Sequence, residues 1–361
     1  MEHVTCNLCG HDRTSIVLQQ RDPIFGSPEE FTVVRCRTCG LLYLNPRPTI
    51  EEIGRYYPQQ YFAPAPVKMR SALQRTAKQW SRMLKRWIRE DFYGYPSPEG
   101  RGPWHVIRKV LLWPEQMRRI FRGRDIVPWI GEGRLLDVGC GPGGNLNNLQ
   151  EQGWDVYGIE LSEAAVARAR AVVGDRVHCG TLATAPFEEE SFDVIFMSHS
   201  LEHVFDPVQE LRRVRKLLKA EGRLIIAVPN VDSLEAKLFS RWWIHWDPPR
   251  HLYHFSKKTL IRLLEQAGFH VLRLRTGIGH FFFMATLERM CRQAWGRGVP
   301  ARTIIEQLVA KPFCVLTGHS GFGTEITVHA APTGPSRLST SNQKRASHAK
   351  PRLGTQRNVL D

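Results

Sequence analysis

The chain has 361 residues, of which 42% are hydrophobic and 24% are charged, which leaves room for one large catalytic domain and smaller additions. Its net charge is +15, but residues 63–134 hold 16 Lys and Arg against 6 Asp and Glu, and residues 332–361 hold 6 against 1. The rest of the chain is almost neutral, which argues against a nucleic-acid-binding core. No apolar run reaches the roughly 18 residues of a membrane span, and the first residues do not resemble a signal peptide, so we expect a cytoplasmic protein.

Four cysteines near the start of the chain form two closely spaced pairs, Cys6-x2-Cys9 and Cys36-x2-Cys39. Two residues between the members of a pair let both thiolates face one ion, and two such pairs close a tetrahedral site. Residues 1–62 are too few to fold on a hydrophobic core alone, so a metal ion would stabilise them. We expect a structural zinc ion here. Free thiols, disulfides in a secreted protein, and iron in place of zinc stay open as alternatives.

Residues 63–130 form a basic segment with helical periodicity. Apolar residues recur every three or four positions, and basic residues fill the other face; the first apolar series is Leu73, Ala77, Trp80, Leu84, Trp87 and Ile88. A second series starts at Trp104 and is expected to be interrupted at Trp113-Pro114. Such a segment can lie on an anionic membrane, face a polyanion, or pack on the core with a solvated basic face. Peripheral membrane contact therefore stays open.

From residue 133 onward, short apolar runs alternate with helical patterns, which predicts a parallel sheet covered by helices. The expected strands are residues 135–138, 156–159, 192–196, 224–228, 271–274 and 325–330, and the expected helices are residues 146–152 and 164–173. We assign residues 131–331 to this α/β domain, including a mostly helical excursion over 279–323. The polar tail, residues 332–361, is poor in large apolar residues and is expected to be disordered.

A glycine-rich turn, Gly139-Cys140-Gly141-Pro142-Gly143, follows the first expected strand. Dinucleotide-binding proteins place such glycines beneath a pyrophosphate. Here Asp137 precedes the turn, and its carboxylate would repel phosphate but favour a cationic group. Glu160 lies 23 residues after Asp137, at the end of the second strand, where it can accept hydrogen bonds from both ribose hydroxyls. The two carboxylates favour S-adenosylmethionine, which lacks phosphate and carries sulfonium and ammonium groups, over a dinucleotide.

These motifs, together with the sequence from Ser191 to Ile195 and the Leu201-Glu202-His203 that follows, resemble a class I S-adenosylmethionine-dependent methyltransferase over residues 133–277. The resemblance implies a Rossmann-like fold, with a seven-stranded sheet whose last strand is antiparallel. It also implies that the glycines approach the cofactor, that Glu160 binds the ribose, and that Thr181 and Leu182 flank the adenine. The cofactor residues expected on this basis are Asp137, Gly139, Gly141, Gly143, Glu160, Thr181, Leu182 and Ser198.

The resemblance extends beyond the cofactor motifs. The cysteine module, the turn at 45–48, the aromatic stretch at 56–62 and the segment 246–256 are similar to those of a bacterial subgroup of these enzymes. Related zinc modules occur in deoxysugar C-methyltransferases, and related cores occur in ubiquinone-pathway O-methyltransferases. The resemblance therefore implies a small-molecule, sugar-linked or carrier-linked acceptor. We expect the zinc-ribbon-like module to form one wall of the acceptor pocket.

Methyl transfer from a sulfonium is an in-line displacement, so a base is needed only where the acceptor must lose a proton. The candidate catalytic residues are four histidines: His199, His203, His251 and His254. The sequence from Asp247 to Arg250 is similar to a signature of amino-group methyltransferases of nucleic acids. That signature belongs after the fourth strand, whereas this segment follows the fifth, so we interpret the similarity as fortuitous.

Other functions stay open at this stage. An rRNA or tRNA methyltransferase could use the cysteine module and the basic segment to bind RNA, and its affinity would then fall steeply with salt. A third hypothesis is a scaffold that binds the cofactor without turnover. The nearly neutral charge of residues 1–62 favours a metabolite acceptor over RNA. The oligomeric state is not indicated by the sequence.

Overall fold

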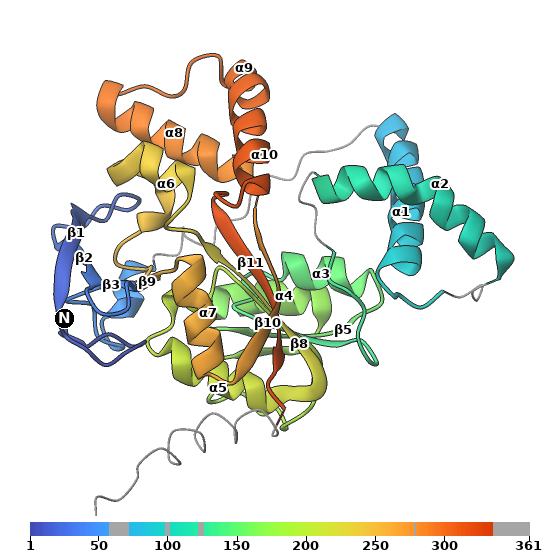
Figure 1. Cartoon of the computed structure of the whole chain (residues 1–361), viewed down its shortest axis with the longest axis horizontal. Helices are drawn as coiled ribbons and strands as arrows, with labels where there is room; N and C mark the ends of the chain where they lie inside the picture. The colour runs from blue at the N-terminus through green and yellow to red at the C-terminus, as the bar shows by residue number, and fades with distance from the viewer. Residues whose placement is uncertain (58–71, 98–101, 122–125, 278, 335–361) are drawn as a thin grey trace, which may run out of the picture.

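The computed structural model describes residues 1–57, 72–97, 102–121, 126–277 and 279–334, which form two β-sheets with helices around them (Figure 1). Most of the tail that was expected to be disordered lies outside these residues, as do Tyr61 and Phe62 of the aromatic stretch. Among the helices that are described, none is long and apolar enough to cross a membrane.

The larger sheet has seven strands in the order β10-β11-β8-β7-β4-β5-β6. Neighbouring strands are parallel except around β11, which pairs antiparallel with both β8 and β10. This arrangement confirms the expected seven-stranded sheet with an antiparallel last strand. The strands are β4 (Arg134–Val138), β5 (Asp155–Glu160), β6 (Val177–Cys179), β7 (Phe192–Ser198), β8 (Leu218–Pro229), β10 (Phe269–Thr276) and β11 (Glu325–Pro332).

Apolar side chains on the central strands point alternately to the two faces of the sheet, so both faces are apolar. Leu135, Val194 and Ile225 belong to the core that includes the apolar residues of α3 (Gly144–Gln150) and α4 (Glu163–Val173). Their sequence neighbours Leu136, Ile195 and Leu224 belong to the core that includes those of α5 (Pro207–Leu217) and α7 (Lys257–Gln266). Side chains of successive strand residues point to opposite faces, so both faces bury apolar surface and the apolar runs look continuous in the sequence.

The expected excursion after β10 is helical. It comprises α8 (His280–Trp295), α9 (Arg302–Ile305), the π-helix η6 (Glu306–Ala310) and α10 (Lys311–His319). Together with α6 (Leu234–Phe239) these helices form a layer beyond one end of the large sheet (Figure 1). Phe283 of α8 packs against Phe239 of α6 and Phe313 of α10, with ring centroids about 5 Å apart in both pairs. These aromatic contacts hold the helices of the layer together.

The smaller sheet joins the N-terminal residues to the catalytic region. Its order is β1-β2-β3-β9, with β1 (Thr14–Arg21), β2 (Glu30–Cys36) and β3 (Leu42–Leu44) from the N-terminal part and β9 (Tyr253–His254) from far along the chain. The pairing is antiparallel, with Leu42 opposite His254 and Tyr43 opposite Tyr253. The module expected over residues 1–62 thus shares a sheet with the segment 246–256.

A buried arginine reinforces this junction. Arg250 is fully buried and donates to Asp22 through Nη1 and Nη2, at 2.7 and 2.8 Å. Its Nε also donates to Oδ1 of Asp247, at 3.0 Å. The bidentate pairing with Asp22 ties the N-terminal module to the loop before β9. In the structure, Asp247 and Arg250 thus take part in the packing of this loop against the N-terminal module.

The basic segment contains two helices, α1 (Ala72–Phe92) and α2 (Pro103–Phe121), which lie on the opposite side of the molecule from the small sheet (Figure 1). Arg108 of α2 binds Asp91 of α1, with Nε 2.8 Å from Oδ2. The expected interruption at Trp113-Pro114 was wrong, because α2 continues through Pro114. Contacts on both sides of the proline hold the helix: Trp113 packs on Phe92, and Gln116 donates to the hydroxyl of Tyr93.

Candidate active site

The three glycines of the turn between β4 and α3 have different surroundings. All have positive φ angles: +79° at Gly139, +53° at Gly141 and +80° at Gly143. A Cβ on Gly139 would lie 2.7 Å from Cβ of Ser200, and one on Gly143 would lie 2.9 Å from Cα of Ala169 in α4. A Cβ on Gly141 would meet nothing within 4 Å. The first and third glycines are thus needed for close packing, whereas Gly141 borders open space that a ligand could enter.

Glu160, at the end of β5, is oriented by the backbone around the turn. Its Oε2 accepts from the N–H of Gly141 and its Oε1 from the N–H of Ser162, both at 2.9 Å. Each carboxylate oxygen keeps a further lone pair that could accept from a hydroxyl group. The side chain is held rigidly and is still able to bind a ribose, so its geometry fits the expected role.

Asp137, the second carboxylate of the motif, is buried beside the turn and accepts from Nδ2 of Asn145 at 2.9 Å. Burial and the nearby Glu160 raise the pKa of Asp137 to about 6, while the Asn145 amide acts in the opposite direction. A cationic ligand group between or beside these two neighbouring carboxylates would stabilise their ionised forms. This is the electrostatic condition expected for a site that binds an ammonium or sulfonium group.

The other expected cofactor residues lie along the same edge of the sheet. Leu182 is buried, and Thr181 is exposed with its N–H donating to Oγ1 of Thr184 at 3.0 Å. Ser198 is the last residue of β7. All three follow or end strands at the carboxyl edge, which is where open α/β sheets bind ligands.

A cavity of about 890 Å³ adjoins this edge. It reaches from Asn145 and Ser198 to Phe282 of α8 and Glu325 of β11. Its volume lies in the usual range for small-molecule sites. Basic side chains also line it: Lys257, Arg273 and Arg275. The helical excursion therefore roofs a pocket with a cationic side.

His199, which follows β7, lies between two carboxylates. Its Nδ1 is 3.3 Å from Oε1 of Glu202, and its Nε2 is 2.8 Å from Oε2 of Glu325. Burial favours the neutral ring, but the two carboxylates outweigh it and raise the pKa of His199 to about 10. The ring is therefore an imidazolium at neutral pH, able to donate two hydrogen bonds and unable to accept a proton.

The structure brings all four candidate histidines into one cluster. The ring of His203 lies 4.7 Å from that of His251, and the ring of His251 lies 6.2 Å from that of His254, centroid to centroid. Burial lowers the pKa of His203 to about 4 and that of His254 to about 3. Unlike His199, these rings are neutral at physiological pH.

Other members of the cluster were not among the candidate catalytic residues. His245 stacks on His199, with ring centroids 5.8 Å apart, and its carbonyl oxygen lies 2.8 Å from Nδ1 of His251. The hydroxyl of Tyr57 lies 3.0 Å from Nδ1 of His203. Glu202 and Glu325 complete the set. Only Glu202 had a local signal, its place beside His203; the other three are brought there by tertiary contacts.

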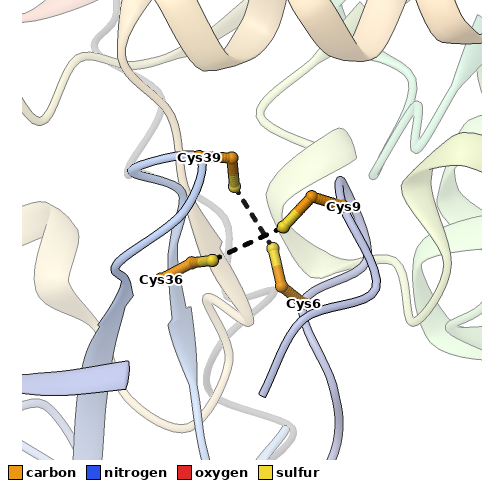
Figure 2. Close-up of side chains that lie close together, drawn as sticks. All are labelled: Cys6, Cys9, Cys36 and Cys39. Atoms are coloured by element: carbon orange, nitrogen blue, oxygen red, sulfur yellow. Dashed lines mark hydrogen bonds between the residues drawn. The ribbon is translucent and has the colours of Figure 1, made fainter. Parts of the chain in front are cut away.

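The four cysteines of the N-terminal pairs converge on one point (Figure 2). Sγ of Cys6 lies 3.4 Å from that of Cys39, and Sγ of Cys9 lies 3.5 Å from that of Cys36. These separations are far too long for disulfides and close to the roughly 3.8 Å expected between thiolates on a tetrahedral zinc ion. The quartet therefore fits the structural zinc that the spacing suggested.

Parts of the chain are similar to known proteins. Residues 104–274 match the family model described as "Methyltransferase domain". The chain is 37% identical to an uncharacterised 37.1 kDa protein in a Streptomyces fradiae transposon, over 27% of this chain and 31% of that protein. It is 35% identical to a ubiquinone biosynthesis O-methyltransferase of Idiomarina loihiensis, over 37% of this chain and 60% of that protein. A solved SAM-dependent methyltransferase of Thermotoga maritima is 21% identical, with a TM-score of 0.41 over 64% of this chain and 100% of that one.

The chain thus spans about a third to three fifths of the length of these two curated relatives. The matched region includes β4, β5 and the glycine turn, where the two carboxylates and Gly141 form the candidate cofactor site. Residues 104–274 thus match a methyltransferase domain, and a module with four clustered cysteines precedes the matched region.

Proposed function

We propose that this protein transfers a methyl group from S-adenosylmethionine to a small-molecule or carrier-linked acceptor. The observation that carries the proposal is the geometry around Glu160. Its carboxylate is fixed by the N–H groups of Gly141 and Ser162 beside the open side of the turn. The cofactor, when bound, supplies a methyl group attached to a sulfonium. Asp137 and Glu160 provide the negative charge that such a ligand requires.

The cavity next to the turn supports a small acceptor with an acidic or phosphate-bearing part. It is of small-molecule size, and Lys257, Arg273 and Arg275 line one side of it. Guanidinium and ammonium groups recognise carboxylates and phosphates. Relatives named for ubiquinone and menaquinone biosynthesis support a small-molecule acceptor. An RNA acceptor has no comparable support, although α1 and α2 are basic.

The histidine cluster adjoins this cavity through Glu325 and Phe282, which line it and contact His199. His199 is already protonated, so we propose that it orients or neutralises an acceptor rather than removing a proton. The neutral histidines are better suited to accept a proton. A base of this kind is required only where the acceptor atom carries a proton.

The test is methyl transfer in mixtures. The protein is incubated with methyl-labelled S-adenosylmethionine and, separately, polar metabolites, lipid-linked metabolites and total RNA. We expect label in an acidic or phosphate-bearing small molecule, and loss of transfer in Glu160→Gln because the ribose contact is weakened. Label confined to RNA would overturn the proposal. Cofactor binding by calorimetry that is unaffected by Glu160→Gln would overturn the assignment of the cofactor site.

A further inference from the structure

A second group of potential metal ligands lies inside the histidine cluster. One ligand atom each from Glu202, His203 and His251 lie within 4.8 Å of one another. Glu202 and His203 belong to the short helix η3 (Leu201–His203), and His251 belongs to the loop before β9. Two imidazoles and one carboxylate form a common donor set for first-row divalent metals, and it leaves coordination positions open.

The backbone fixes both imidazoles in the form that such a site needs. Nδ1 of His203 lies 3.0 Å from the carbonyl oxygen of Arg250, and Nδ1 of His251 lies 2.8 Å from that of His245. A carbonyl oxygen can only accept, so each Nδ1 carries the proton and each Nε2 keeps its lone pair. The Tyr57 hydroxyl, 3.0 Å from Nδ1 of His203, then lies there as an acceptor. Histidines that bind metals are held in this way, with the remote nitrogen donating to a carbonyl or carboxylate.

Glu202 supplies an independent indication. Its side chain is fully buried, and neither carboxylate oxygen accepts a hydrogen bond from the described residues. Its Oε1 lies 3.3 Å from Nδ1 of His199, while Oε2 has no hydrogen-bond partner among the described residues. Leaving an ionised carboxylate oxygen unpaired in the interior is strongly unfavourable, so a cation on that side would be favoured.

We propose that Glu202, His203 and His251 bind a divalent first-row metal ion, such as Mn²⁺, Fe²⁺ or Zn²⁺. The site is separate from the cysteine quartet and borders the histidines next to the acceptor cavity. Its role rests on the proposed function: the open positions would bind an oxygen of the acceptor and orient it toward the methyl group. Asp247, whose Oδ2 lies 3.9 Å from Nε2 of His251, stands just outside the ligand set.

The proposal is tested by Mn²⁺ titration of the full-length protein with its cysteines loaded with zinc. Thiolates prefer zinc, so added Mn²⁺ reports on the nitrogen and oxygen site. Free Mn²⁺ is followed by electron paramagnetic resonance, without cofactor or acceptor. We expect one bound Mn²⁺ per chain. Affinity should fall at least about tenfold in Glu202→Gln and His251→Gln, because even outer-shell changes weaken metal sites by this amount.

His254→Gln is the matched control. His254 is buried in the same cluster, but it is not one of the three ligands, so we expect Mn²⁺ affinity to be unchanged. If Glu202→Gln does not fold, as judged by circular dichroism and melting, His203→Gln at the less buried ligand provides the same test. Absence of saturable binding to the unmodified protein, or equal affinity in the ligand variants, would overturn the proposal. Binding is measured without turnover, so a failed activity assay would leave this result intact.

Discussion

The substitutions Gly141→Ala and Gly143→Ala, in the turn between β4 and α3, are expected to have different effects on stability. Both variants place a residue with a side chain at positive φ, which destabilises the fold by about 1–2 kcal/mol. At Gly143 the new Cβ would also lie 2.9 Å from the backbone of Ala169, so α4 must shift. Overpacking of this kind adds about 1–3 kcal/mol. Gly143→Ala should therefore lose clearly more stability than Gly141→Ala, whose Cβ would enter open space.

Among the folded proteins, Gly141→Ala should lose more affinity for the cofactor than Gly143→Ala does. The Cβ of Gly141→Ala would occupy the space proposed for the ligand, so we expect affinity for S-adenosylmethionine to fall about tenfold or more, a loss of about 1.4 kcal/mol. Urea unfolding gives the stabilities, with an unchanged slope showing that the folded state is intact. Calorimetry gives the affinities. Equal destabilisation by both substitutions, or normal binding by Gly141→Ala, would refute the reasoning.

Three further predictions concern pH, metal and membranes. Burial raises the pKa of Glu235 from 4.5 to about 7, so stability that is present below pH 4.5 is lost as the pH rises through 7. At alkaline pH, urea titrations should therefore show a free energy of unfolding up to about 3 kcal/mol higher in Glu235→Gln than in the unmodified protein. The control Glu151→Gln, at an exposed position, should show no such gain. Cys39→Ser should lower both the zinc content, measured by mass spectrometry, and the melting temperature. Full zinc content in this variant would contradict zinc binding by the four cysteines. Trp104 and Leu111 of α2 are 76% and 74% exposed. Peripheral membrane contact through this surface predicts that serine at both positions weakens sedimentation with anionic vesicles, and unchanged sedimentation would exclude this surface.

Features carried by nearby residues could be predicted from the sequence. The cysteine pairs, the glycine turn and the carboxylates at the ends of β4 and β5 depend on local spacing and strand order. The histidine cluster could be predicted only in part. His199 meets Glu325, 126 residues away, through the antiparallel placement of β11, and no local pattern reports that contact.

In α2, a local sequence signal led to a wrong prediction because tertiary contacts overrode it. A proline inside a helix removes one backbone hydrogen bond and crowds the preceding turn, so local reasoning ends the helix there. Contacts of Trp113 with Phe92, at the end of α1, and of Gln116 with Tyr93, which follows it, compensate for that loss and come from another part of the chain. Propensity is a weak guide where packing acts on both sides of a residue.

The pairing of β3 with β9 has a consequence for protein engineering. Because Leu42 and Tyr43 complete a sheet with Tyr253 and His254, the cysteine module cannot be exchanged as an independent cassette. Removing it would leave the β9 backbone without its partner and would take Asp22 away from Arg250. A chimera with another enzyme would have to carry both residues 1–57 and the loop from 246 to 256. These two segments must be transplanted together although they lie far apart in the sequence.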